Sequence, residues 1–327
     1  MDATGHGSLR PLRPVRFKRG AGRPAISASS AVNSTANSSP PKMPELRTAD
    51  GLSLHVQDWP VPDGVAWRGS LLLVHGLGEH SGRYDHVAAA LGAEGVFVRS
   101  WDQRGFGRSG GKRAVLPHPE ALLDDARLVY DALAADAEAA GDDAPPFLMG
   151  HSMGGAVAAR AATGGWIAPR GLVLSSPALG ARMTLSQRVQ LAVGRRLMPT
   201  LAVPNGLPVD ALSRDPATIA AYRADAMVHD RVTPRLAQFI LDAGAQAIAD
   251  APRLRVPTLV LVAGSDRIVD AGGARAFAAA LPDGVGTLHV YDALYHEILN
   301  EREPDRGRVL GDLRAWIAGQ LAGARAR

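Results

Sequence analysis

The sequence predicts an α/β protein with a mostly parallel central sheet, helices on both faces of the sheet and an inserted helical cap. Three observations support this class. Short apolar runs recur along the chain, which is typical of strands buried on both faces. Helical patterns separate them, so we expect parallel strands joined by right-handed crossovers. The chain has 327 residues, 46% of them hydrophobic, which is enough for one large core.

The strands are predicted from two kinds of apolar pattern. Leu52, Leu54 and Val56 alternate with polar residues, which predicts a half-buried edge strand. Continuous apolar runs predict buried strands at 71–74, 96–98, 147–149, 172–174 and 258–262, and an alternating run predicts a last strand at 287–291. The main helix expected between them covers 120–140, opens after Pro119 and carries one apolar stripe.

The alternation of strands and helices stops over residues 178–250, where the chain is helical in pattern with proline and glycine breaks. This predicts a cap inserted between a first core segment, 45–177, and a second core segment, 251–327. In such sheets the ligand site lies at the carboxyl ends of the strands. The cap is therefore expected to cover the site.

One cap helix admits two interpretations. Leu185, Val189, Val193 and Leu197 recur every four residues, with glutamine and arginine on the other side. An ordinary cap helix would pack this apolar side onto the protein. An interfacial helix would instead place it against lipid.

Residues 1–44 are rich in arginine, serine and proline and lack hydrophobic periodicity, so we expect a disordered tail. They carry seven basic and one acidic side chain, a local charge of +6, which leaves −2 of the total +4 for the rest. The slightly acidic body removes the main support for nucleic-acid binding. No signal-peptide pattern or membrane-spanning run is found, so a cytoplasmic protein is expected, with peripheral membrane contact at most.

The segment Gly150-His151-Ser152-Met153-Gly154 fits the pattern of a nucleophile elbow, with an apolar run before it and an alanine-rich helical pattern after it. In this turn a serine stands exposed at the top of the sheet. Cysteine is absent from the chain, so a thiol nucleophile is excluded. Ser152 is the predicted nucleophile.

A serine hydroxyl needs a base, and the base needs an acid that fixes its tautomer. The acid candidate is Asp266, which directly follows the run 258–262 and comes 114 residues after Ser152. Asp270 is a competitor, but it lies farther from the strand end and is expected to begin the next helix.

The base candidate is His296, just beyond the alternating run 287–291. Only one other histidine, His289, follows the acid, and it lies within the predicted strand. The order serine, acid, histidine is the order that this strand-turn-helix arrangement requires.

Acyl transfer also needs two N–H donors for the developing oxyanion. The backbone of Met153, directly after the nucleophile, is expected to supply one. Leu77, in the turn after the run 71–74, is expected to supply the other.

Four separated segments resemble the monoacylglycerol lipases and lysophospholipases of the α/β-hydrolase fold. They read HGLGEHSGRY at 75–84, WDQRGFGRS at 101–109, GHSMGG at 150–155 and YHE at 295–297. The resemblance covers residues 44–319, includes the size and position of the cap, and leaves the basic tail outside.

This resemblance implies a serine esterase that cleaves one acyl chain from a glycerol-based lipid through an acyl-enzyme, with no metal or cofactor. The residues carried over from the family are the same: Ser152, Asp266 and His296 as the triad, and Leu77 and Met153 as the oxyanion donors. Glu79, His80 and Arg83 match the family's turn after the oxyanion loop. We expect them to form an ion-paired scaffold near the site, with contact between Glu79 or His80 and the glycerol hydroxyls as the alternative.

Several alternatives stay open at this point. The same serine, histidine and aspartate would serve an amidase, a peptidase or a thioesterase. A ligand-binding protein that keeps the fold without catalysis is a further class. The expected partner is a small acyl ester, with membrane contact through the cap and no nucleic acid.

Overall fold

The computed structural model describes residues 46–181 and 183–325. The chain divides into two compact units, Met1–Lys42 and Met43–Arg327, and the described residues all belong to the second. The disorder expected for residues 1–44 lies outside the described residues.

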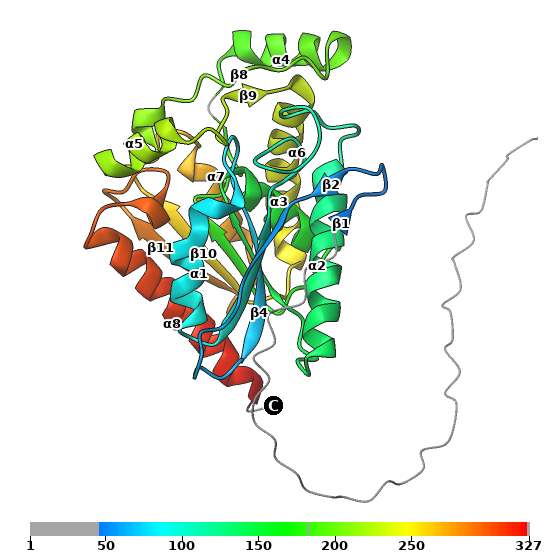
Figure 1. The fold of residues 1–327 in the computed structure, drawn as a ribbon. Coiled ribbons are helices and arrows are strands. Elements are labelled where there is room, and N and C mark those ends of the chain that lie inside the picture. Colours follow the sequence, from blue (N-terminus) through cyan, green and yellow to red (C-terminus); the bar gives the residue numbers. More distant parts are fainter. Residues whose placement is uncertain (1–45, 182, 326–327) are drawn as a thin grey trace, which may run out of the picture. The chain divides into compact units, whose positions relative to one another are not determined.

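The second unit is built on a seven-stranded sheet whose order is β11-β10-β7-β6-β4-β5-β3 (Figure 1). Only β3 runs antiparallel, against β5, and every other neighbouring pair is parallel. The strands are β3 (Val56–Trp59), β4 (Gly69–Val74), β5 (Val96–Trp101), β6 (Phe147–His151), β7 (Leu172–Ser175), β10 (Thr258–Ala263) and β11 (Gly286–Tyr291). This confirms the predicted fold class.

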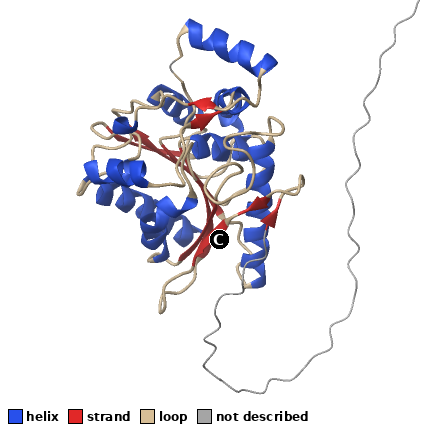
Figure 2. Cartoon of the chain, turned by 45° about the horizontal axis from the view of Figure 1, so that its top comes forward, coloured by secondary structure: helices blue, strands red, loops and turns tan. Residues whose placement is uncertain are grey.

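Helices cover both faces of the sheet, as Figure 2 shows. Helices α1 and α8 pack on one face, while α2, α3, α6 and α7 pack on the other. The helices are α1 (Asp85–Gly92), α2 (Ala121–Ala139), α3 (Met153–Thr163), α4 (Leu185–Leu197), α5 (Pro216–Ala224), α6 (Pro234–Asp250), α7 (Ala271–Ala280) and α8 (Asp305–Arg325). Short 3₁₀ turns are η1 (Ser81–Tyr84), η2 (Val209–Ala211), η3 (Ala251–Arg253) and η4 (Ile298–Asn300).

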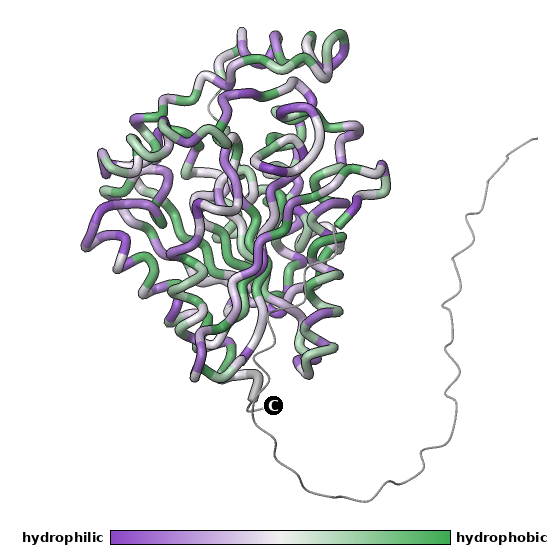
Figure 3. The backbone as a smooth tube through the Cα atoms, viewed as in Figure 1, coloured by the Kyte–Doolittle hydropathy of each residue, from purple (hydrophilic) through white to green (hydrophobic). Residues whose placement is uncertain are grey.

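The strands alternate their side chains between the two helical layers. Along β4, Leu71 and Leu73 face the layer of α1 and α8, whereas Leu72 and Val74 face the other layer. Because both faces are covered, β4 is buried throughout, and its residues 71–74 form a continuous apolar run. Figure 3 shows the resulting concentration of hydrophobic residues along the central strands.

The predicted edge strand is broken in two. Residues 53–54 form β2 (Ser53–Leu54), which pairs with β1 (Leu46–Arg47), and β3 begins only at Val56. His55 interrupts the strand because its backbone N–H donates to Ser109 Oγ at 2.8 Å instead of to a neighbouring strand.

The predicted cap region, 178–250, holds α4, α5 and α6 together with a small hairpin of β8 (Val203–Pro204) and β9 (Arg231–Val232). Its last helix, α6, packs against α3 and α7 and so forms part of the layer on the sheet. Helix α4 lies at the top of Figure 1, and none of its residues is buried. Among the described helices, none combines the length and the apolar character needed to cross a bilayer.

Candidate active site

Ser152 occupies the tight turn between β6 and α3. Its φ of 53° and ψ of −119° lie in a strained region for a residue with a side chain. The turn is possible because both flanking positions are glycine: a Cβ at Gly150 would lie 2.2 Å from the carbonyl oxygen of Gly154, and one at Gly154 would lie 2.2 Å from that of Val74. The predicted elbow geometry is present.

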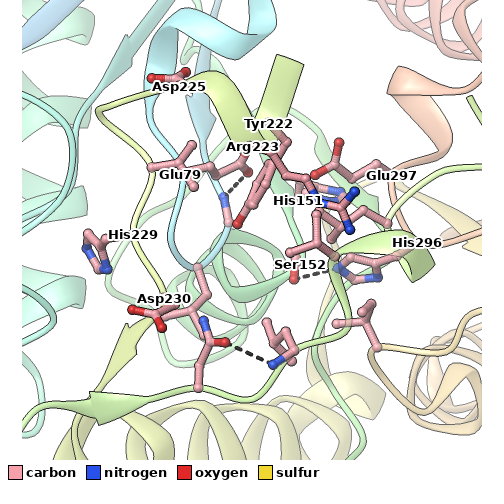
Figure 4. Close-up of a pocket in the computed structure, with 18 residues that line it drawn as sticks. Glu79, His151, Ser152, Tyr222, Arg223, Asp225, His229, Asp230, His296 and Glu297 are labelled. Atoms are coloured by element: carbon pink, nitrogen blue, oxygen red, sulfur yellow. Dashed lines mark hydrogen bonds between the residues drawn. The ribbon is translucent and has the colours of Figure 1, made fainter. Parts of the chain in front are cut away.

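The three separated residues predicted as nucleophile, base and acid form one hydrogen-bonded row. Ser152 Oγ lies 2.8 Å from His296 Nε2, and His296 Nδ1 lies 2.7 Å from Asp266 Oδ2. The carboxylate can only accept, so Nδ1–H donates to Asp266 and Nε2 is left to accept from the serine hydroxyl. All three side chains are buried, and Figure 4 shows Ser152 beside His296.

Asp266 is held as a carboxylate. Burial alone would raise its pKa, but the hydrogen bond from His296 and two backbone N–H donors, Ile268 at 2.8 Å and Val269 at 3.0 Å, keep the pKa below its usual range. The competitor Asp270 instead caps α7, where its side chain accepts from the N–H of Gly272 at 3.1 Å.

Leu77 and Met153 lie at the same site. Both residues line one cavity together with Ser152. Met153 is the first residue of α3, so its N–H has no acceptor within the helix. Within residues 46–181 and 183–325, no group accepts a hydrogen bond from either N–H.

The residues that match the turn after the oxyanion loop form an ion-paired network. Glu79 accepts from Arg83 at 2.6 Å, from Tyr84 Oη at 2.7 Å and from the N–H of Gly76 at 2.5 Å. Burial would raise the pKa of Glu79, but the charge of Arg83 and the other partners lower it to about 2. Glu79 is thus a charged residue that fixes the loop before Leu77.

Arg83 and His80 tie this turn to other parts of the chain. The guanidinium of Arg83 binds Glu297 through two hydrogen bonds of 2.8 and 2.7 Å. His80 Nε2 lies 2.7 Å from Asp225 Oδ2, and its Nδ1 accepts from the backbone at 3.1 Å. The contact of Arg83 fixes Glu297, the residue after the predicted base. The contact of His80 fixes Asp225 in the predicted cap region.

His151 is a site residue that sequence analysis missed, although it lies inside the elbow motif. Its ring centroid is 5.0 Å from that of His296. Burial and the nearby His296 lower the pKa of His151 to about 4, so it is neutral at pH 7. A neutral neighbour leaves His296 free to take up a proton without repulsion.

Two cavities meet at Ser152. The first, of about 340 Å³, is lined without any charged side chain by residues that include Met153, Leu179 and Ile240. The second, of about 200 Å³, is lined by apolar residues and by most of the charged side chains near Ser152; we call it the polar cavity, and Figure 4 shows it. Its charged lining consists of four acidic residues and one arginine: Glu79, Asp225, Asp230, Glu297 and Arg223.

The polar cavity also contains Tyr222 of α5, which sequence analysis did not single out. The guanidinium of Arg83 lies 4.8 Å from the centre of the Tyr222 ring. No motif marks α5, so only the fold could reveal this residue. Among the described residues, no cluster of three potential metal ligands is found.

Comparison with known proteins agrees with this geometry. A family model described as serine aminopeptidase, S33, matches residues 66–303. A monoacylglycerol lipase of Mycolicibacterium smegmatis is 37% identical over 258 residues, which is 78% of this chain and 89% of the relative.

Solved structures give the same result. The crystal structure of a monoacylglycerol lipase from Paleococcus ferrophilus is 31% identical, covers 82% of this chain and 99% of its own, and has a TM-score of 0.72. A monoglyceride lipase variant from Saccharomyces cerevisiae, at 22% identity, covers 87% of this chain and 97% of its own with a TM-score of 0.77, which shows the shared fold.

The elbow, the order of the strands and these relatives define a serine hydrolase of the α/β-hydrolase fold. Within that class, the chain belongs to the Hydrolase_4 family, the serine aminopeptidase S33 family, whose model spans most of it.

Proposed function

We propose that the protein hydrolyses monoacylglycerols, with Ser152, His296 and Asp266 as its catalytic triad. The enzyme is an ester-hydrolysing serine hydrolase. The observation that supports this substrate is that an uncharged cavity and a cavity with mainly acidic charged residues meet at Ser152. A lipid with a single acyl chain and a neutral polar alcohol matches both.

In the proposed reaction, Ser152 Oγ attacks the ester carbonyl while His296 Nε2 takes the hydroxyl proton. The N–H groups of Leu77 and Met153 bind the oxyanion. His296 then gives its proton to the departing alcohol, which leaves an acyl group on Ser152. Water, deprotonated by His296, releases the fatty acid and restores the hydroxyl.

The acyl chain is assigned to the uncharged cavity. Its lining combines Leu77, Leu207, Ile268 and other apolar residues, so an alkyl chain there loses contact with water at no electrostatic cost. Each buried methylene contributes roughly 0.8 kcal/mol to binding.

The alcohol is assigned to the acidic cavity. A glycerol group can donate hydrogen bonds to its carboxylates, whereas a phosphate-bearing head group would face four carboxylates and one arginine. Arg223 is already paired with Asp210 at 2.8 Å. The carboxylates are paired as well: Glu79 and Glu297 with Arg83, Asp225 with His80, and Asp230 with Arg231. The lining therefore offers a phosphate no unpaired arginine, which favours monoacylglycerol over lysophospholipid.

A panel of three substrates tests this assignment. We expect kcat/KM for a monoacylglycerol to exceed that for a lysophosphatidylglycerol of the same chain length by about tenfold or more, because the anionic phosphate finds no unpaired arginine in this cavity. An aminoacyl anilide represents the peptidase alternative and should be turned over more slowly still. Preference for the anilide would contradict the ester assignment, and preference for the lysophospholipid would contradict the assigned alcohol cavity.

We also propose that residues 178–250 act as the cap and that α4 lies on the membrane surface. The four residues of its apolar stripe are all exposed, Leu185 at 79% and Leu197 at 69%. A helix that packed its stripe onto the protein would have buried them. Exposed Met198, Leu201 and Val203 extend the apolar surface beyond the helix.

Replacing Leu185, Val193 and Leu197 with serine tests the membrane contact. We expect binding to phosphatidylcholine vesicles to weaken by roughly a hundredfold, since each lost side chain removes apolar area from the interface. Turnover of a short, water-soluble ester should not change. Serine at Val65 and Leu288, which are exposed elsewhere, is the matched control. Equal vesicle binding by both variants would contradict the role of α4.

A further inference from the structure

A groove lies between α4 and α6, and none of the four stripe residues of α4 lines it. Its main cavity has a volume of about 790 Å³ and takes Arg195 and Arg196 from the last turn of α4. An adjoining cavity of about 280 Å³ shares Arg195 and adds Arg188. We call these two cavities together the arginine groove.

The arginine side chains that α4 contributes have no ion-pair partner and no acceptor for their N–H groups. In the part of the chain that the structure describes, the side chains of Arg188, Arg195 and Arg196 make no hydrogen bond and no ion pair. Arginine near a helix C-terminus does favour the helix dipole. That effect applies to Arg195 and Arg196 but not to Arg188 near the start of α4, and it leaves all three guanidinium groups without acceptors.

The opposite wall of the arginine groove adds further positive charge. Arg160 lines it and pairs with Asp250 at 2.8 Å, and Arg235 donates to the carbonyl oxygens of Leu116 and Pro117. The acidic lining residues are Glu120 and Asp242. Asp242 accepts from Gln238 at 2.7 Å. The lining therefore has more cations than anions.

Apolar side chains complete the arginine groove. Trp166 and Phe239 line the same cavity as Arg195 and Arg196. A guanidinium binds phosphate oxygens in a bidentate manner, and the aromatic walls suit the hydrocarbon part of a lipid. The combination fits an amphiphile with a phosphate head better than a free ion, which has nothing to place against the aromatic rings.

We propose that the arginine groove binds the phosphate group of an anionic phospholipid while α4 lies on the bilayer. This inference depends on the membrane contact proposed above. A helix that buries an apolar stripe in the interface places its flanking cations at the depth of the lipid phosphates. The groove would then orient the enzyme on anionic membranes, where α4 alone gives attachment without a preference for charge.

The test uses the full chain carrying Ser152→Ala, so that no lipid is hydrolysed. Binding is measured to phosphatidylcholine vesicles with and without about 30% phosphatidylglycerol. For Arg195→Gln with Arg196→Gln we expect affinity for the anionic vesicles to fall about tenfold or more, with little change on neutral vesicles. The matched control removes two exposed arginines elsewhere, Arg275→Gln with Arg302→Gln, and should change either affinity less than twofold.

The other outcomes are equally decisive once thermal unfolding shows that each variant is folded. If the groove and control variants lose anionic binding equally, only general charge is involved and the groove proposal is overturned. If the parent binds both vesicle types equally, it is also overturned, while the contact through α4 stands. Saturable binding of inorganic phosphate that needs Arg195 would assign the groove to a soluble ion. Binding to no vesicle at all would remove the membrane contact too.

Discussion

Replacing Ser152 with alanine is expected to lower ester turnover by about 10⁴ to 10⁶-fold, the range seen when a triad nucleophile is removed. The hydroxyl is the group that forms the acyl bond in this reaction, and it lies 2.8 Å from His296 Nε2. Alanine fits the same backbone, so the fold should persist. Steady-state hydrolysis of a monoacylglycerol is the measurement, with thermal unfolding to verify the fold.

His296→Ala should reduce turnover by a similar factor, and the double variant should be little worse than either single one, because the two residues act as one unit. His289→Ala is the matched control, since that side chain lies on β11 and its Nδ1 is 3.7 Å from Asp312. More than a tenth of normal turnover in the Ser152→Ala variant would overturn the assigned nucleophile.

Replacing Asp266 with asparagine is expected to lower kcat by about 10⁴-fold while KM changes little. The present carboxylate accepts from His296 Nδ1 at 2.7 Å, and this leaves Nε2 as an acceptor for the serine proton. An amide at this position would donate to Nδ1 and place the imidazole proton on Nε2. The base would then be blocked at the atom that must receive the proton, and an imidazolium would lack its counter-charge.

The matched control for this variant is Asp270→Asn. Asp270 caps α7 through its side chain, and asparagine is an equally good cap residue, so turnover should stay within about twofold. Equal losses of turnover for the two variants would mean that Asp266 is not the carboxylate that orients His296. Separate measurement of kcat and KM is essential, since a purely structural loss would alter both.

The core of the site could be predicted because each reacting group comes within five residues of the end of a strand. Ser152, Asp266 and His296 follow β6, β10 and β11, and carboxyl ends of parallel strands meet at one edge of a sheet. The apolar runs located the parallel strands of the sheet, and each predicted strand was one to three residues shorter than the observed one. The cytoplasmic location expected from the sequence stays a prediction.

Only part of the polar cavity could be predicted: Glu79 and Glu297 lie in recognised motifs, but the residues from the cap region come from elements without a pattern. Tyr222 and Asp225 lie in and just after α5, whose position depends on tertiary contacts such as the His80 to Asp225 hydrogen bond. The N–H of Glu297 donates to the carbonyl oxygen of Leu212 at 2.7 Å and adds a second such contact. Neither contact has a signature in local sequence.

The exposure of α4 also could not be predicted from the sequence. The four-residue spacing of Leu185 and its stripe predicted an amphipathic helix, and the helix is present. Periodicity defines which side of a helix is apolar, but not what that side touches. That depends on how the preceding and following segments place the helix, which the sequence did not reveal.

Labelling with alkyl fluorophosphonates tests the central assignment most directly. Mass spectrometry should find one adduct, on Ser152, whose rate of formation rises as the alkyl chain lengthens into the uncharged cavity and drops steeply in His296→Ala. An adduct on another residue, or a rate at Ser152 that ignores both the chain length and the loss of His296, would contradict a histidine-activated serine at the meeting point of the two cavities.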